Sequence, residues 1–182
     1  MSRFSSLTKV NPSPILKPVF MPVLMALVIV VSVSACSEQT DDKRSPKPTF
    51  LFLDGRSVTL DTFQSKWVLV NFWSVSCPPC YEEMPDLVKL DNEPGLDVIG
   101  VSMSYDRPDL IVETQKKMNL SYPLSLDLKG QVNQAFGSID VIPTSFLIDP
   151  QGKIEKKYLG TVSYEQLMTD LKKIKQKING SD

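Results

Sequence analysis

Two of the three cysteines in this 182-residue chain stand close together, at positions 77 and 80 in the segment NFWSVSCPPCYEEMP. A Cys-x-x-Cys pair can be half of a zinc site, a structural disulfide or a reactive dithiol. Zinc needs three or four ligands, and a chain with no histidine and one further cysteine offers few of them, so we expect no metal. A disulfide across so short a loop stabilises a fold little, because its entropic effect grows with loop length. The spacing therefore favours a reactive dithiol and leaves a structural disulfide as the alternative.

The residues around the pair indicate how the two cysteines differ. An apolar run before Cys77 and a helical pattern after it place Cys77 at a helix N-terminus, where N–H groups and the helix dipole stabilise a thiolate. Cys80 falls inside the first turn, more buried and well placed to attack a mixed disulfide formed by Cys77. Position 79 is proline, so the Cys80 N–H is the main donor to the Cys77 sulfur. One donor predicts a modestly lowered pKa, nearer ~7 than the ~3.5 of a strong oxidant, which favours a reductant.

Residues 1–35 carry the pattern of a lipoprotein signal peptide. They hold three basic residues and no acidic one, then the apolar run 23–31 and the small residues that precede Cys36. The run is too short to span a bilayer comfortably. The ending VSAC resembles the bacterial lipobox, which implies lipid attachment at Cys36 and an extracytoplasmic, periplasm-facing protein anchored to a bacterial membrane, the outer membrane being one option. A plain signal peptide or an uncleaved anchor is the alternative.

The mature chain is expected to be one domain on a flexible tether. Residues 36–48 are polar and end in prolines, which is typical of a solvated tether, and residues 49–180 have the length of a single domain. Three of the 20 basic residues lie in the leader, which leaves 17 against 21 acidic residues, a net charge of −4. Such a balance does not favour nucleic acid as a partner, because nucleic-acid binding needs a basic face.

The apolar pattern of the domain predicts strands that alternate with helices, and therefore an α/β fold with a central mixed sheet and helices on both faces. Two short apolar stretches around Asp54-Gly55 predict an N-terminal β-hairpin. Continuous apolar runs at 67–73 and 96–103 suit strands buried on both faces. The other expected elements are helices at 81–92, 107–119 and 130–137, a short strand at 122–127, a hairpin that turns at 150–152 and a final helix.

The final helix is expected to begin at Ser163, which can form a capping box with Gln166. Its inner stripe is expected to consist of Leu167, Leu171, Ile174 and Ile178, and the lysines between them to form its solvated side.

Several motifs follow one another over roughly residues 48–178: LDGRSVTL, VLVNFW, CPPC, EEMP, IGVSM and VIPTSFLID, then a hairpin and a helix. In these motifs the chain resembles the TlpA/ResA-like thiol–disulfide oxidoreductases. The resemblance implies a thioredoxin-like fold with an N-terminal β-hairpin and a central βα insertion, and protein disulfide reductase activity with no cofactor beyond the Cys77–Cys80 disulfide. It also implies oxidised secreted proteins, apocytochrome c among them, as substrates, and a membrane thiol-relay protein as electron donor.

The resemblance also gives expected roles to residues near the CPPC motif. Glu83 matches the glutamate of a C-x-x-C-x-x-E pattern, proposed to tune the buried thiol, and it shares a helix face with Cys80. Asn71 stands where thioredoxin has a buried aspartate that serves the second cysteine. Glu82 is expected to be only an acid favoured near a helix start. Ser76 replaces the tryptophan that usually precedes the first cysteine, which opens the surface beside the thiol.

Pro143, in VIPTSF, matches the proline that is cis in thioredoxin-fold proteins and packs beside the cysteines. The backbone before it, at Ile142, pairs with extended substrate in that family. We expect Trp73, Pro78 and Pro79 to contact substrate as well. The expected catalytic set is Cys77, Cys80, Glu83 and Pro143.

Two other functions remain open. Peroxiredoxins share the fold, but their reactive cysteine follows the pattern P-x-x-x-T/S-x-x-C, and no proline stands among residues 66–76 before Cys77. A non-catalytic binding lipoprotein with a structural CPPC disulfide is the second alternative. A peroxide-consumption assay separates the first, and titration against glutathione separates the second, because a structural disulfide resists reduction.

Overall fold

The structure is a computed structural model that describes residues 45–63 and 65–180. The predicted leader, the predicted lipid site at Cys36 and most of the predicted tether lie outside the described residues. Among the helices that are described, none has the length and hydropathy needed to cross a membrane.

The first described residues lie against the domain. The Ser45 N–H donates to the Gly152 carbonyl at 2.6 Å, and Lys47 forms an ion pair with Asp61 at 3.1 Å. The last residues of the predicted tether therefore already contact the folded part of the chain.

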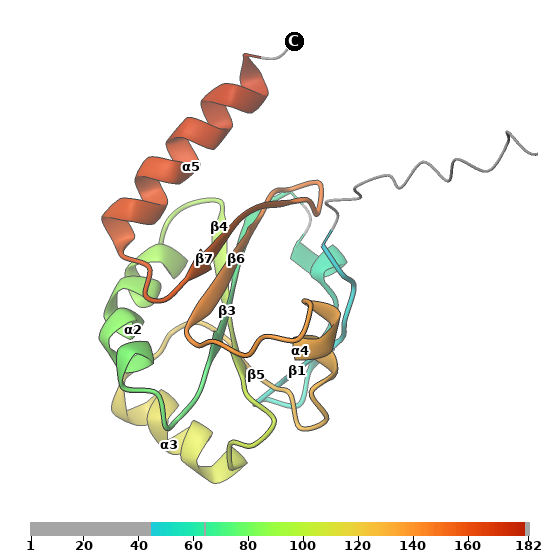
Figure 1. The fold of residues 1–182 in the computed structure, drawn as a ribbon, viewed down its shortest axis with the longest axis vertical. Helices are drawn as coiled ribbons and strands as arrows, with labels where there is room; N and C mark the ends of the chain where they lie inside the picture. The colour runs from blue at the N-terminus through green and yellow to red at the C-terminus, as the bar shows by residue number, and fades with distance from the viewer. Residues whose placement is uncertain (1–44, 64, 181–182) are drawn as a thin grey trace, which may run out of the picture. The chain divides into compact units, whose positions relative to one another are not determined.

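The described residues form one seven-stranded mixed sheet (Figure 1). Its strands follow the order β2-β1-β5-β4-β3-β6-β7, in which β3, β4 and β5 are parallel and all other neighbours are antiparallel. The predicted central mixed sheet and the N-terminal hairpin are confirmed. The strands are β1 (Phe50–Phe52), β2 (Ser57–Val58), β3 (Trp67–Trp73), β4 (Leu96–Ser102), β5 (Leu124–Leu126), β6 (Thr144–Ile148) and β7 (Ile154–Leu159).

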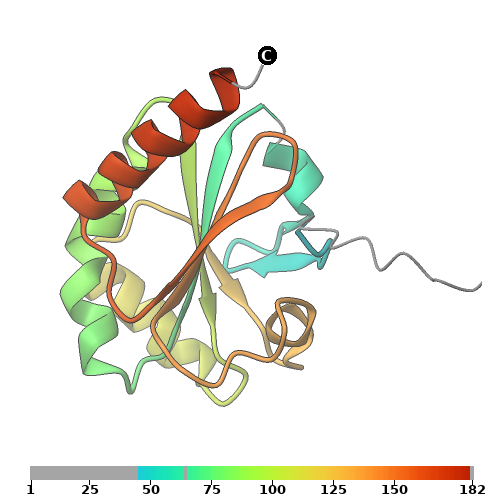
Figure 2. The same ribbon diagram turned by 45° about the horizontal axis from the view of Figure 1, so that its top comes forward.

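Helices cover both faces of the sheet, as predicted (Figure 2). One apolar cluster joins the sheet to α2, α3 and α5, and a second joins its other face to α4 and the 3-10 helix η1. The central insertion expected from the resemblance is α3 with β5, between β4 and α4. The helices are η1 (Leu60–Phe63), α2 (Pro78–Asp91), α3 (Pro108–Lys117), α4 (Gln131–Ala135) and α5 (Tyr164–Asn179).

Strand β3 is the centre of the fold and carries the functional segment at its end. All seven of its residues are buried, because β4 and β6 pair with its two edges and both apolar clusters cover its faces. This is why the strand reads as a continuous apolar run rather than an alternating one.

Helix α5 begins as predicted but differs from the prediction near its end. The Ser163 side chain accepts from the Gln166 N–H and caps the helix. Of the predicted inner stripe, Leu167 and Leu171 are buried, whereas Ile178 is 41% exposed. The expectation that Ile178 packs inward is therefore wrong, because the helix continues past the last side chains that could cover it.

The two ends of the sheet carry different features. Strand β3 leads into α2 at one end, which we call the CPPC end. Because β6 is antiparallel to β3 and β7 to β6, β7 also finishes at the CPPC end. Helix α5 then runs back, so its C-terminal turns lie at the opposite end, together with the β6–β7 turn that Ser45 contacts (Figures 1 and 2).

Candidate active site

The CPPC segment forms the start of α2, directly after β3. Cys77 is the N-cap residue, with an extended backbone (φ −106°, ψ 98°), and Pro78 and Pro79 follow as the first helical residues. Proline suits these positions, because its fixed φ fits a helix and its missing N–H has no partner to lose there. The Cys80 N–H donates to the Cys77 sulfur at 3.3 Å. The structure thus places Cys77 at a helix N-terminus, as the sequence predicts.

The two cysteines form a disulfide and differ in exposure. Their Cα atoms are 5.4 Å apart, and Cys77 is 7% exposed while Cys80 is 1% exposed. Ser76 and Pro78, the chain neighbours of Cys77, are both exposed. A large substrate can therefore approach the Cys77 sulfur more easily than the Cys80 sulfur.

Glu83 is buried within α2, whereas Glu82 beside it is exposed. The Glu83 carboxylate accepts from the Asn71 side-chain amide at 2.8 Å and from the Val162 N–H at 2.9 Å. Burial raises the pKa of Glu83 to about 7, although both hydrogen bonds act in the opposite direction. A carboxyl group with this pKa can take up or release a proton near neutral pH, and it lies on the helix face of Cys80.

Asn71 connects Glu83 to strand β6. Its side-chain amide also donates to the Ser145 hydroxyl at 2.9 Å, and the two residues lie opposite each other across β3 and β6. Both are buried, so each needs such a partner inside an apolar core. Ser145 was not singled out from the sequence, because only the register of the two strands brings it to Asn71.

The Ile142–Pro143 peptide bond is cis, as the resemblance implies. Pro143 directly precedes Thr144, which lies opposite Phe72 near the end of β3. The structure therefore brings Pro143 to the CPPC end of the sheet. The Pro143 carbonyl accepts from the Gly160 N–H at 2.8 Å, which ties the start of β6 to the end of β7.

The residues predicted as substrate contacts lie in different surroundings. Pro78 and Pro79 are exposed and Ile142 is half-buried, so all three have surface that a substrate can touch. Trp73 is only 1% exposed and packs in the same apolar cluster as both cysteines. Substrate contact by Trp73 stays a prediction that its burial does not support, because the ring packs inside the domain beside the CPPC segment.

Asp106, between β4 and α3, is a further residue at the CPPC end. Its buried carboxylate accepts from the Ser74 hydroxyl at 2.7 Å and from the Val75 N–H at 3.3 Å, and the Ser74 hydroxyl lies 2.9 Å from the Ser76 hydroxyl. Asp106 thus holds the segment between β3 and Cys77. Asp106 was not singled out from the sequence, although the carboxyl ends of parallel strands are where such polar loop residues meet.

This arrangement is suited to two-electron exchange through sulfur. The Cys77–Cys80 disulfide takes up two electrons and two protons on reduction, and a nearby carboxyl group can exchange one of those protons. Within residues 45–63 and 65–180, no group of three or more Cys, His, Asp or Glu side chains is placed to hold a metal ion.

Comparison with known proteins gives consistent results. Residues 43–157 match the AhpC/TSA family. The thiol-disulfide oxidoreductase ResA of Bacillus thuringiensis subsp. konkukian is 35% identical over 136 residues, which cover 72% of this chain and 77% of that protein. ResA of Geobacillus thermodenitrificans is 34% identical over 137 residues, with the same coverage of both chains.

Solved structures show the same likeness. The crystal structure of StoA from Bacillus subtilis has a TM-score of 0.58 and 26% identity, over 66% of this chain and 92% of that one. A thiol:disulfide interchange protein of the thioredoxin family from Chlorobium tepidum has a TM-score of 0.62 and 26% identity, over 68% of this chain and 90% of that one. The expected thioredoxin-like fold is confirmed.

Proposed function

We propose that this protein, a member of the AhpC/TSA family, works as a reductase of disulfides in secreted proteins. The chain is a thiol–disulfide oxidoreductase of the ResA type. The direction of electron flow, from enzyme to substrate, is inferred from the surroundings of the Cys77 sulfur. The Cys80 N–H donates to it, and Pro79 has no N–H to add. A pair becomes a strong oxidant when its reduced form is strongly stabilised, so limited stabilisation of the Cys77 thiolate favours a reductant.

The reaction consists of two thiol–disulfide exchanges. The Cys77 thiolate attacks one sulfur of the substrate disulfide, forms a mixed disulfide and releases the other substrate sulfur as a thiolate. Cys80 then loses its proton and attacks the Cys77 sulfur, which closes the Cys77–Cys80 bond and releases the second substrate thiolate. The substrate gains two electrons and the enzyme loses two, so a donor must reduce the enzyme again.

Glu83 is proposed to accept the proton of Cys80 in the second exchange. Its pKa of about 7 lets it be ionised in part of the molecules at neutral pH, and its bonds to Asn71 and Val162 hold the carboxyl group in one place. Pro143 and Ile142 are proposed to receive the extended substrate chain beside Cys77.

Location and partners follow from the resemblance and the leader. We propose that residues 1–35 are removed, that Cys36 carries lipid, and that the domain lies outside the cytoplasm on a bacterial membrane. Oxidised secreted proteins, apocytochrome c among them, are the proposed substrates, and a membrane thiol-relay protein is the proposed electron donor. An extracytoplasmic reductase needs such a donor, because no glutathione pool re-reduces it there.

Equilibration of the Cys77–Cys80 pair with glutathione tests the direction. We expect a reduction potential of roughly −200 to −270 mV, in the range of reducing and isomerising thioredoxin-fold enzymes. A potential near −120 mV, that of a strong oxidant, would contradict a reductase. A disulfide that resists glutathione entirely would indicate a structural bond, and rapid peroxide consumption would indicate a peroxidase.

Cell fractionation of a Cys36→Ser variant tests the anchor. We expect the variant to leave the membrane fraction or to be mislocalised, with a folded and active domain, because the lipid is attached to the cysteine sulfur. Unchanged membrane association and an unchanged mass of the mature N-terminus would rule out lipid at Cys36.

A further inference from the structure

The last ten described residues of the chain carry charge of one sign. Residues 171–180, LKKIKQKING, contain four lysines and no acidic residue, although the mature chain as a whole has more acids than bases. Lys172, Lys173 and Lys175 are all exposed. The Lys175 ammonium group lies over the Trp67 ring, 5.8 Å from its centroid, in a cation–π contact with the domain.

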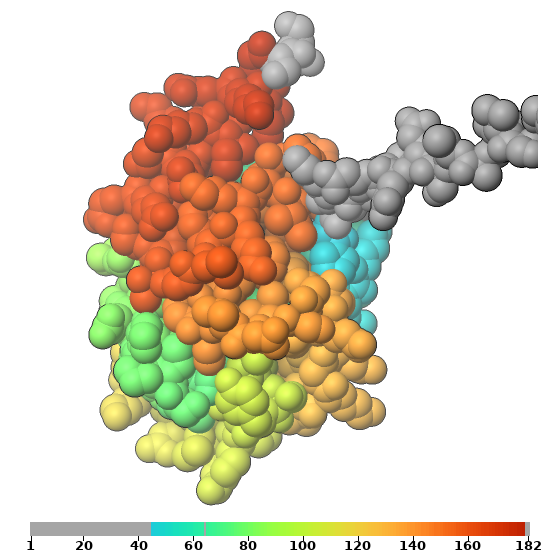
Figure 3. All heavy atoms as spheres, viewed as in Figure 1, coloured from blue at the N-terminus to red at the C-terminus, as the bar shows by residue number. Residues whose placement is uncertain are grey.

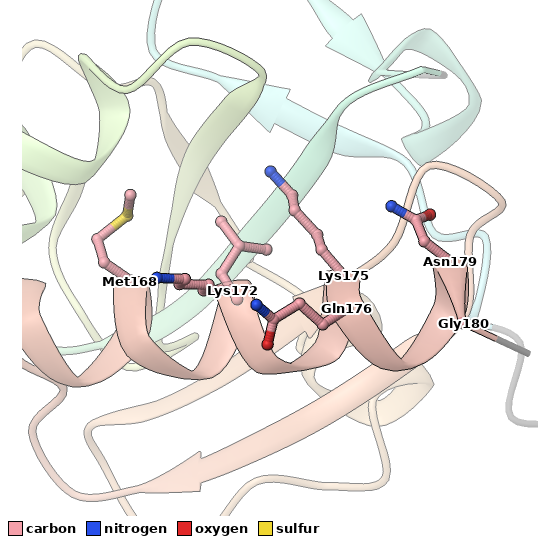
Figure 4. A pocket seen from close by; sticks show the side chains of 7 residues that line it. Met168, Lys172, Lys175, Gln176, Asn179 and Gly180 are labelled. Carbon is pink, nitrogen blue, oxygen red and sulfur yellow. The ribbon is translucent and has the colours of Figure 1, made fainter.

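The same turns of α5 also present apolar surface. Ile178 continues the stripe of Leu167 and Leu171 but is 41% exposed. On the neighbouring side of the helix, Met168, Lys172 and Lys175 line an open groove (Figure 4). The C-terminal turns of α5 project past the β6–β7 turn (Figures 1 and 3). A projecting helix end with one exposed apolar side chain, Ile178, and the half-buried Met168 beside lysines has the composition of a segment that lies on an anionic membrane surface.

The path of the chain brings this helix end close to the proposed anchor. The C-terminal turns of α5 and Ser45 both lie at the end of the sheet opposite the CPPC motif. Nine residue steps separate Ser45 from Cys36, and even a fully extended chain spans at most about 32 Å over that length. If Cys36 is anchored, the end of the domain that carries Ser45 and the lysines is the one held near the lipid.

We propose that the C-terminal turns of α5, residues 171–180, bind the surface of an anionic bilayer. The proposal depends on the proposed lipid anchor in one respect only: the anchor brings the domain to the membrane. Its consequence is an orientation: the lysines face the lipid headgroups, and the CPPC end, which carries Cys77 and Pro143, faces away from the bilayer towards protein substrates. Because the mature chain is acidic overall, the attraction has to come from this local surface rather than from net charge.

Vesicle co-sedimentation tests the proposal with a chain that carries no lipid. The mature chain from residue 36 is produced without its leader and with Cys36→Ser, then mixed with vesicles of phosphatidylglycerol and phosphatidylcholine or of phosphatidylcholine alone. We expect binding to the anionic vesicles only, and release at high salt, because salt screens charges beyond a few ångströms. One lysine near an anionic surface strengthens binding about fivefold, so Lys172→Gln, Lys173→Gln and Lys175→Gln together should weaken it by about 100-fold.

A matched control variant removes the same number of positive charges from a part of the surface outside α5. Lys116→Gln, Lys117→Gln and Lys129→Gln together alter three exposed lysines outside α5 and should leave vesicle binding unchanged. Disulfide exchange in solution should be the same for the α5 variant as for wild type, because the C-terminal turns of α5 lie at the end of the sheet opposite the CPPC motif. This readout separates a failure of the membrane surface from a failure of the proposed reductase function.

Several results would overturn the proposal. Equal binding to both kinds of vesicle, no binding to anionic vesicles at low salt, or equal loss in the two triple variants would each exclude a specific role for α5. A dimer in solution that the α5 variant abolishes, without vesicle binding, would assign this surface to a second copy of the chain instead.

Discussion

Replacement of Glu83 by glutamine should change how the stability of the oxidised protein depends on pH. Glu83 is buried, and its pKa is raised to about 7 from the usual 4.5 of a glutamate side chain. A carboxyl group with a raised folded-state pKa binds its proton more tightly in the folded protein than in the unfolded chain. It therefore contributes stability that is complete below the unfolded pKa and is lost as the pH rises through the folded pKa.

The size of this effect follows from the shift. A shift from 4.5 to about 7 corresponds to about 3 kcal/mol, at about 1.4 kcal/mol for each pKa unit. Between about pH 5 and about pH 8, about 2.5 kcal/mol of that stability is expected to disappear. Glutamine cannot titrate, so the free energy of unfolding of wild type minus that of Glu83→Gln should fall by this amount over the same range.

Urea unfolding of both proteins at several pH values, with the disulfide kept oxidised, measures this difference, and the subtraction removes the titration of all other groups. Unchanged m-values are needed for the comparison. Glu82→Gln serves as the control, because Glu82 is exposed. The free energy of unfolding of wild type minus that of Glu82→Gln should not change with pH. A difference for Glu83→Gln that rises with pH would refute the reasoning, because it would mean that the bonds from Asn71 and Val162 outweigh burial.

Three further substitutions should lower stability, each measured as a shift in the urea midpoint at constant m. Asp106→Asn should cost about 1–3 kcal/mol, because the new amide NH₂ group would face the Val75 N–H, which now donates to the carboxylate. A wild-type midpoint would show that Asp106 does not hold this segment. Ser163→Ala should cost about 1 kcal/mol through loss of the α5 cap; no change would mean that the cap is dispensable. Gly100→Ala should cost about 1–3 kcal/mol, because a Cβ there would lie 2.6 Å from a Leu124 methyl group, and a neutral result would show that the core yields at that point.

The parts of the site that local sequence signals specify were predicted correctly. The apolar run of β3, the prolines after Cys77 and the acids of α2 are close together in the chain, so strand, cap and helix could be inferred from periodicity and spacing. The helix face shared by Cys80 and Glu83 is likewise a local property, because it depends only on helical spacing.

The parts that long-range pairing decides were missed. Ser145 reaches Asn71 across 74 residues of chain, and Ser74 reaches Asp106 across 32, and neither pairing has a local signature. Trp73 shows a related limit, because a continuous apolar run predicts a buried strand without saying which residue lines the surface. Ile178 was misplaced because the helical period predicts a face, whereas the length of the body that covers it is set by other elements.

Trapping of mixed disulfides tests most directly the central claim that Cys77 attacks and Cys80 resolves. In cells that make Cys80→Ser, the first exchange can occur and the second cannot. We therefore predict covalent complexes with secreted proteins that are visible on non-reducing gels and that carry substrate on Cys77 by mass spectrometry. Cys77→Ser should show neither complexes nor activity. Adducts that form on Cys80 alone, or retained activity without any trapped complex, would contradict the mechanism.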